Sequence, residues 1–228
     1  MATPVLLVHG WGGSFATTWE STGFTQLLAD AGRPVIGVDL LGHGTAPKPH
    51  EPEAYADLTA RVLDAMPPEP IDAVGFSLGA LTLLQIACEQ PHRFSHLVLA
   101  GVGQGVFEPD DAGTERIISG LEGTAPADDN LARHFANYAR QPGNDIAALT
   151  AIMKRPRAAT LTPASVSRAS CPTTVVIGAR DFGWPGDALA GALPAGSLVV
   201  LRNVDHFATP ESFGFIDATL QFLGAVPV

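Results

Sequence analysis

The sequence has few basic residues and few cysteines, and it has no long apolar run. Thirteen Lys and Arg stand against 23 Asp and Glu, which gives a formal net charge of −10 at pH 7. Binding to nucleic acid relies on clustered cations that displace counterions from the phosphate backbone, so we expect no nucleic-acid partner. The tightest basic cluster, Lys154, Arg155 and Arg157, is typical of a solvated helix end, with an anion site as the alternative.

The two cysteines, Cys88 and Cys171, lie far apart without metal-type spacing, and we interpret both as buried thiols. No cluster of His, Cys, Asp or Glu has the spacing of metal ligands, so we expect no metal. The glycines Gly101, Gly103 and Gly105 do not fit the Gly-x-Gly-x-x-Gly spacing of a dinucleotide-binding loop. The sequence therefore predicts an activity without a cofactor.

The N-terminus lacks a basic region, and its apolar run is too short for a signal peptide or a membrane span. We therefore expect a cytoplasmic protein without a membrane partner. Hydrophobic residues make up 46% of the chain and charged residues 16%, which is typical of an ordinary globular protein. A chain of this length can form one domain with a single layered core.

Short β-branched apolar runs alternate with helical patterns along most of the chain. Continuous apolar runs are typical of strands buried on both faces of a parallel sheet, and they occur at residues 5–8, 35–38, 71–76, 97–100, 174–177 and 198–201. The helical patterns cover residues 24–31, 55–65, 78–89, 187–192 and 212–222. This order predicts an α/β fold with a doubly wound, mostly parallel sheet of about six strands.

Residues 104–169 interrupt the alternation, because they contain no convincing strand. Helical patterns around 112–121, 128–140 and 145–154 are separated by prolines and glycines. We interpret residues 104–169 as an inserted helical lid. Residues 1–103 and 170–228 would then form the core.

The most informative segment is residues 71–79, Ile-Asp-Ala-Val-Gly-Phe-Ser-Leu-Gly, in which a strand runs directly into a helix. It has the Gly-x-Ser-x-Gly pattern of a nucleophile elbow around Ser77. Side chains at Gly75 and Gly79 would collide with the adjoining strand and helix at such a strained turn. The context predicts that Ser77 is a nucleophile rather than part of a structural turn.

Four further segments complete a resemblance to the α/β-hydrolase family that covers nearly the whole chain. They are residues 8–13 (Val-His-Gly-Trp-Gly-Gly), 39–44 (Asp-Leu-Leu-Gly-His-Gly), 177–181 (Ile-Gly-Ala-Arg-Asp) and 204–207 (Val-Asp-His-Phe). They resemble the loops after the family's third and fourth strands, the strand end with its acid, and the loop with its histidine. The sequence begins on what would be the third strand, so we expect the family's N-terminal antiparallel hairpin to be missing.

The chain order Ser77, Asp181, His206 is the order that this fold requires for a catalytic triad. A serine hydroxyl needs a histidine to remove its proton, and a carboxylate must hold that histidine in the useful tautomer. Asp205 is the alternative acid, but neighbouring side chains in an extended loop point apart. We therefore expect Asp181 to orient His206.

The other histidines have weaker contexts for chemistry. We expect His9 and His43 to shape loops beneath the site. The remaining four, interpreted as surface or lid residues without a partner pattern, are His50, His92, His96 and His134.

The resemblance also implies an oxyanion hole and a substrate pocket. The oxyanion would be bound by the backbone N–H groups of Trp11 and Leu78. Apolar residues near the strand ends would line a pocket for an uncharged group, and the candidates are Phe76, Val102, Phe107, Phe182, Trp184 and Phe207.

These features favour hydrolysis of a carboxylic ester, lactone or thioester with a small, mostly apolar acyl group. Hydrolysis of a carbon–carbon bond, cofactor-free lyase chemistry and perhydrolase chemistry are alternatives on the same triad, because the pocket decides the reaction. A ligand receptor that keeps the triad with little turnover is a third possibility. The sequence gives no indication of the oligomeric state.

Overall fold

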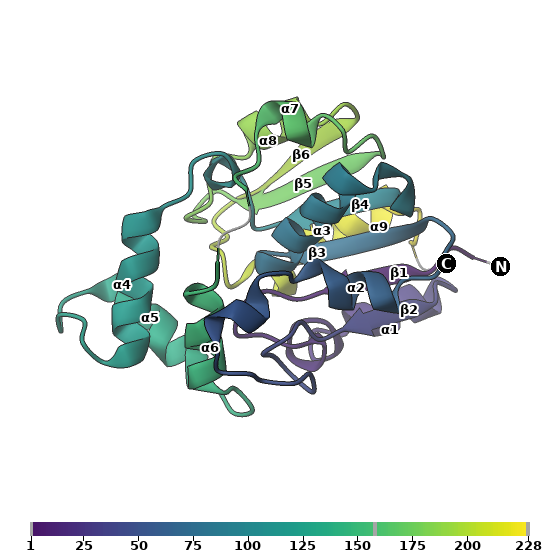
Figure 1. Ribbon diagram of the computed structural model, residues 1–228. Coiled ribbons are helices and arrows are strands. Elements are labelled where there is room, and N and C mark those ends of the chain that lie inside the picture. Colours follow the sequence, from purple (N-terminus) through teal and green to yellow (C-terminus); the bar gives the residue numbers. More distant parts are fainter. Residues whose placement is uncertain (1, 157–158, 227–228) are drawn as a thin grey trace.

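Over residues 2–156 and 159–226, which the computed structural model describes, the centre of the molecule is a six-stranded sheet (Figure 1). Residues 1, 157–158 and 227–228, which include Arg157 of the basic cluster and both ends of the expected core, lie outside the described residues. The strands are β1 (Val5–Val8), β2 (Val35–Val38), β3 (Ile71–Phe76), β4 (Phe94–Ala100), β5 (Thr173–Gly178) and β6 (Gly196–Leu201). They lie in the order β2-β1-β3-β4-β5-β6, and all neighbouring pairs are parallel, which confirms the predicted fold class.

Alternate residues of each central strand enter two separate cores, which is why these strands are apolar throughout. In β1, Leu6 and Val8 belong to one core, while Val5 and Leu7 belong to the other. The first core is covered by helices α2 (Thr59–Ala65), α3 (Leu78–Glu89) and α8 (Asp187–Ala192). The second is covered by a short π-helical segment (Ala16–Glu20), α1 (Phe24–Asp30) and α9 (Phe213–Phe222).

The segment between β4 and β5 contains the expected helices, and those over residues 111–153 lie beyond the carboxyl ends of the strands (Figure 1). Its elements are a 3-10 turn (Gln104–Val106), α4 (Asp111–Glu122), α5 (Asn130–Ala139), α6 (Ile146–Met153) and the short α7 (Pro163–Val166). Aspartates at 110, 129 and 145 cap α4, α5 and α6 by accepting hydrogen bonds from first-turn N–H groups. The lid segment, as used below, means α4, α5, α6 and their connections.

Two local features differ from the sequence expectation. The helix expected over residues 55–65 is divided into a 3-10 turn (Pro52–Tyr55) and α2, because the Asp57 side chain accepts hydrogen bonds from Thr59 and begins a new helix there. In addition, α7, which the sequence placed in the lid, packs against α3 and α8 of the core. None of the helices in the described ranges has the length and apolar character to cross a bilayer.

Candidate active site

Ser77 occupies a strained turn between β3 and α3. Its backbone has φ 51° and ψ −112°, a conformation that non-glycine residues rarely adopt. A Cβ atom at Gly75 would lie 2.7 Å from the Ala80 backbone, and one at Gly79 would lie 2.4 Å from the Val8 carbonyl oxygen. Only glycine fits at both positions, so the Gly-x-Ser-x-Gly pattern has the steric origin expected of a nucleophile elbow.

His206 and Asp181 reach Ser77 from the loops after β6 and β5. His206 Nε2 lies 3.0 Å from Ser77 Oγ, and His206 Nδ1 lies 3.0 and 2.9 Å from the two carboxylate oxygens of Asp181. The two loops pack tightly, since a Cβ atom at Gly178 would lie 2.2 Å from the Val204 carbonyl oxygen. The structure therefore brings together the three residues that the sequence placed far apart.

The hydrogen bonds define which ring nitrogen of His206 carries the proton. The Asp181 carboxylate only accepts, so His206 Nδ1 donates to it and Nε2 is left to accept from the Ser77 hydroxyl. Asp181 Oδ1 also accepts the N–H of Gly183 at 2.7 Å, which fixes the carboxylate. Asp205 points elsewhere, because its Oδ1 accepts the N–H of Ala208 at 3.0 Å.

The two backbone donors expected for an oxyanion lie beside Ser77. A Cβ atom at Gly10 would lie 3.2 Å from Ser77 Cβ, so the turn that contains Trp11 is in contact with the elbow. Leu78 is the first residue of α3, where backbone N–H groups have no partner within the helix. Among the described residues, neither the Trp11 nor the Leu78 N–H donates to a protein acceptor.

His9 and His43 pack together beneath this turn, with ring centroids 4.9 Å apart. His9 Nε2 accepts the N–H of Leu40 at 3.1 Å, and its Nδ1 lies 2.8 Å from the Gly10 carbonyl oxygen. Burial lowers the pKa of both imidazoles, to about 3 for His43, so both rings are neutral. Their role is to connect the loops after β1 and β2, as expected.

Aromatic rings surround His206, and three of the expected pocket residues contact it. Phe182 lies 4.1 Å and Phe207 lies 5.4 Å from the His206 ring, centroid to centroid. Phe182 is 61% exposed. Phe76 lies below His206 at 4.9 Å and belongs to the core on the α1 and α9 side.

Of the other three expected pocket residues, Val102 and Phe107 belong to the same apolar cluster as Phe135 and Phe207, and Trp184 is 40% exposed. In addition, α5 of the lid segment supplies three rings around Phe207: His134 at 4.6 Å, Phe135 at 5.7 Å and Tyr138 at 4.8 Å. No sequence pattern indicated these rings, because only the folded lid segment shows which face of α5 meets the strand ends.

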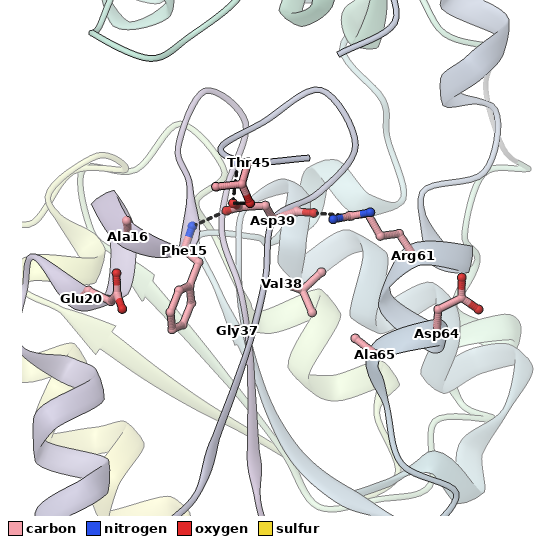
Figure 2. A pocket seen from close by; sticks show the side chains of 10 residues that line it. All are labelled: Phe15, Ala16, Glu20, Gly37, Val38, Asp39, Thr45, Arg61, Asp64 and Ala65. Atoms are coloured by element: carbon pink, nitrogen blue, oxygen red, sulfur yellow. Dashed lines mark hydrogen bonds between the residues drawn. The ribbon is translucent and has the colours of Figure 1, made fainter. Parts of the chain in front are cut away.

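A cavity of about 500 Å³ lies apart from this site, at the β2 edge of the sheet (Figure 2). Asp39 organises its wall, accepting hydrogen bonds from Phe15 N–H at 2.7 Å and from both the N–H and the hydroxyl of Thr45. Burial alone would raise the pKa of Asp39, but these hydrogen bonds lower it. Arg61 donates to the Asp39 carbonyl oxygen at 2.7 Å. The carboxylate of Asp39 therefore holds two loops together.

Two other histidines, for which the sequence offered no partner pattern, have carboxylate partners in the structure. His50 Nε2 lies 3.0 Å from Asp145 Oδ2, and His96 Nδ1 lies 2.9 Å from Asp72 Oδ1. His96 belongs to β4, where it pairs in register with Asp72 of β3. These pairs connect segments far apart in the sequence, which is why no local pattern indicated them.

Residues 3–123 match the sequence model of the alpha/beta hydrolase fold, which is more than half of the chain. The chain therefore belongs to the alpha/beta hydrolase fold family. A hydrolase from Pseudomonas aeruginosa PA01 has a similar structure, with a TM-score of 0.73 and 25% identity over 97% of this chain and 90% of that one.

Two curated relatives have more closely similar sequences over shorter regions. One is the 2-hydroxy-6-oxo-2,4-heptadienoate hydrolase of Pseudomonas putida, 35% identical over 112 residues, 47% of this chain and 40% of that protein. The other is the pimeloyl-[acyl-carrier protein] methyl ester esterase of Neisseria meningitidis, 38% identical over 99 residues, 42% of this chain and 28% of that protein. The matches span less than half the length of either relative.

Proposed function

We propose that the protein is a serine hydrolase that cleaves a carboxylic ester, a lactone or a thioester through an acyl-enzyme on Ser77. One observation carries this proposal: His206 lies 3.0 Å from Ser77 Oγ, while its other ring nitrogen donates to the buried Asp181. A serine hydroxyl becomes a useful nucleophile when a neighbouring imidazole accepts its proton.

In the proposed reaction, Ser77 Oγ attacks the substrate carbonyl carbon as His206 Nε2 takes the hydroxyl proton. The N–H groups of Trp11 and Leu78 bind the negative charge that develops on the carbonyl oxygen. His206 then gives its proton to the leaving alcohol or thiol. A water molecule, activated by the same imidazole, hydrolyses the acyl-enzyme and regenerates Ser77.

The surroundings favour an uncharged, mostly apolar small molecule as substrate. Aromatic side chains contact His206 and Phe207, and two cations of the basic cluster, Lys154 and Arg155, have partners of their own. Lys154 pairs with Glu122 of α4, and Arg155 donates to the Ile152 carbonyl oxygen. We therefore expect neutral aryl or alkyl esters to react faster than substrates with a carboxylate on the acyl group.

Hydrolysis of a carbon–carbon bond is the second candidate, because one curated relative is named as a 2-hydroxy-6-oxo-2,4-heptadienoate hydrolase. That substrate carries a carboxylate, so a substrate panel separates the two candidates. The cytoplasmic location and the lack of a nucleic-acid or membrane partner stay predictions.

The proposal is tested with a fluorophosphonate probe and a panel of 4-nitrophenyl esters, with Ser77→Ala and the exposed Ser167→Ala as variants. We expect stoichiometric labelling of the wild type and of Ser167→Ala, and none of Ser77→Ala. Labelling that persists in Ser77→Ala at another serine would reject the assignment. A single burst without sustained turnover would instead indicate a receptor. Cleavage of 2-hydroxy-6-oxo-2,4-heptadienoate with a higher kcat/KM than any ester of the panel would favour the second candidate.

A further inference from the structure

The turn that carries Trp11 is in contact with the lid segment as well as with the elbow. Residues 10–13 form a reverse turn, in which the N–H of Gly13 donates to the Gly10 carbonyl oxygen at 3.1 Å and Gly12 has φ +73°. Trp11 and Gly12 are the two corner residues. A Cβ atom at Gly12 would lie 2.8 Å from the Tyr138 ring, so α5 packs directly on this corner.

Two side-chain hydrogen bonds join this turn to the lid segment. The indole Nε1–H of Trp11 donates to the Leu149 carbonyl oxygen of α6 at 3.1 Å. The Nδ2 amide of Asn144, just before α6, donates to the Gly12 carbonyl oxygen at 2.8 Å. These bonds span 138 and 132 residues of sequence, and both corner residues of the turn take part.

The start of α6 is itself held on the core. The Asp145 side chain caps α6 by accepting the N–H groups of Ala147 and Ala148, and its other oxygen pairs with His50. The hydrogen bond with Asp145 raises the pKa of His50. Asn144 is therefore presented to the turn by a helix end that is anchored on both sides.

The partners of the Gly10 carbonyl oxygen decide which way the peptide between Gly10 and Trp11 faces. The Gly10 carbonyl oxygen is occupied by Gly13 N–H and lies 2.8 Å from His9 Nδ1. A trans peptide points its N–H opposite to its carbonyl, so the Trp11 N–H is directed away from these partners. The hydrogen bonds of Leu149 and Asn144 hold the next two residues of the turn, Trp11 and Gly12. They therefore restrict rotation of the peptide between Gly10 and Trp11.

We propose that the lid segment is a structural part of the oxyanion hole, with Asn144 as the positioning residue. This inference rests on the proposed function of Ser77 and adds that Asn144 and the Leu149 carbonyl keep the Trp11 N–H aimed at the substrate carbonyl. The α6 side of the lid segment is then a fixed clamp on the turn. A donor that is aimed in advance stabilises the transition state without reorganising during the reaction.

The test compares Asn144→Ala and the isosteric Asn144→Asp, which cannot donate to a carbonyl oxygen, with the matched control Asn137→Ala on the exposed side of α5. Trp11→Phe is a further variant, because it keeps the backbone N–H and removes the indole donor together with part of the ring that packs on Phe135 and Tyr138. Each protein is assayed with a 4-nitrophenyl ester, and for inhibition by a trifluoromethyl ketone, which forms an oxyanion adduct. The corresponding methyl ketone serves as a ground-state analogue.

We expect kcat to fall about tenfold or more in both Asn144 variants and in Trp11→Phe, a partial loss of one oxyanion donor. KM and the affinity for the methyl ketone should stay within about threefold, since both report binding in the ground state, before the oxyanion forms. The trifluoromethyl ketone should lose affinity in proportion to kcat, and Asn137→Ala should behave as wild type. Folded Asn144 variants with wild-type kcat, or with equal losses for both ketones, would overturn the inference.

Amide hydrogen exchange by mass spectrometry separates this inference from the proposed function. Faster exchange at Gly13 in the Asn144 variants, but not in Asn137→Ala, supports the clamp without any reference to activity. Unchanged exchange there overturns the clamp. A wild-type protein that neither reacts with the fluorophosphonate nor cleaves esters would refute the proposed function instead, and the exchange result would still decide whether the clamp exists.

Discussion

Replacing Asp181 with asparagine tests how the carboxylate controls the tautomer of His206. The Oδ1 atom of Asp181 accepts the N–H of Gly183 at 2.7 Å, so the carbonyl oxygen of an asparagine side chain would keep that position. Its amide nitrogen would then take the place of Oδ2, 2.9 Å from His206 Nδ1. The amide N–H then competes for Nδ1 with the retained oxygen, 3.0 Å away, and where the amide donates to Nδ1 it drives the ring proton to Nε2 and blocks acceptance from Ser77.

The expected cost of Asp181→Asn is a fall in kcat of about 10⁴-fold, which is about 5 kcal/mol in the activation barrier. KM should change little, because no substrate contact is removed. Asp205→Asn should lose less than about tenfold, or about 1.4 kcal/mol. The asparagine oxygen can still accept the N–H of Ala208, which is the observed partner of Asp205 at 3.0 Å.

The assay is steady-state and single-turnover cleavage of a 4-nitrophenyl ester by both variants, after circular dichroism and thermal melting show that they are folded. Acylation in a single turnover and the later deacylation should both be slower in Asp181→Asn, since His206 Nε2 has to accept a proton in each step. The reverse ranking, with Asp205→Asn the more damaged protein, would show that the loop geometry after β6 has been misjudged.

Two further predictions concern stability. Burial lowers the pKa of His43 from 6.5 to about 3. Below pH 6.5 the unfolded state therefore binds a proton that the folded state does not bind. This group should lower the free energy of unfolding by about 2 kcal/mol between pH 7.5 and pH 5. His9 adds to the same trend, and His43→Phe should flatten the dependence of Tm on pH; an equally steep curve in that variant would contradict the assignment. Gly79→Ala would place a Cβ atom 2.4 Å from the Val8 carbonyl oxygen and should cost at least about 2 kcal/mol of unfolding free energy. Gly191→Ala in α8, where nothing lies within 4 Å, is the control and should stabilise by up to about 1 kcal/mol in urea denaturation; similar midpoints for the two variants would show that the elbow is not crowded.

The parallel sheet could be predicted from the sequence because its signals are local. Apolar runs such as residues 5–8 and 71–76 are buried on both faces, so they show no polar alternation that could obscure them. The elbow could be predicted as well, because its Gly-x-Ser-x-Gly pattern lies within one strand-turn-helix segment, although the contact that excludes a side chain at Gly79 comes from Val8 of the neighbouring strand. Strand ends were less accurate: β4 begins at Phe94 rather than residue 97, because its pairing with β3 continues to Ile71.

The sequence by itself determined the fold class, the elbow at Ser77 and the order of Ser77, Asp181 and His206, because each rests on local sterics or on connectivity. Only the tertiary structure decided what surrounds them. Asn144 and Leu149 bind the Trp11 turn although more than 130 residues separate them in the sequence. The rings of α5 pack on Phe207, and no sequence pattern in either segment indicates this contact. Such contacts depend on where the lid segment comes to rest on the strand ends, and that placement is set by the packing of whole elements rather than by any one stretch of chain.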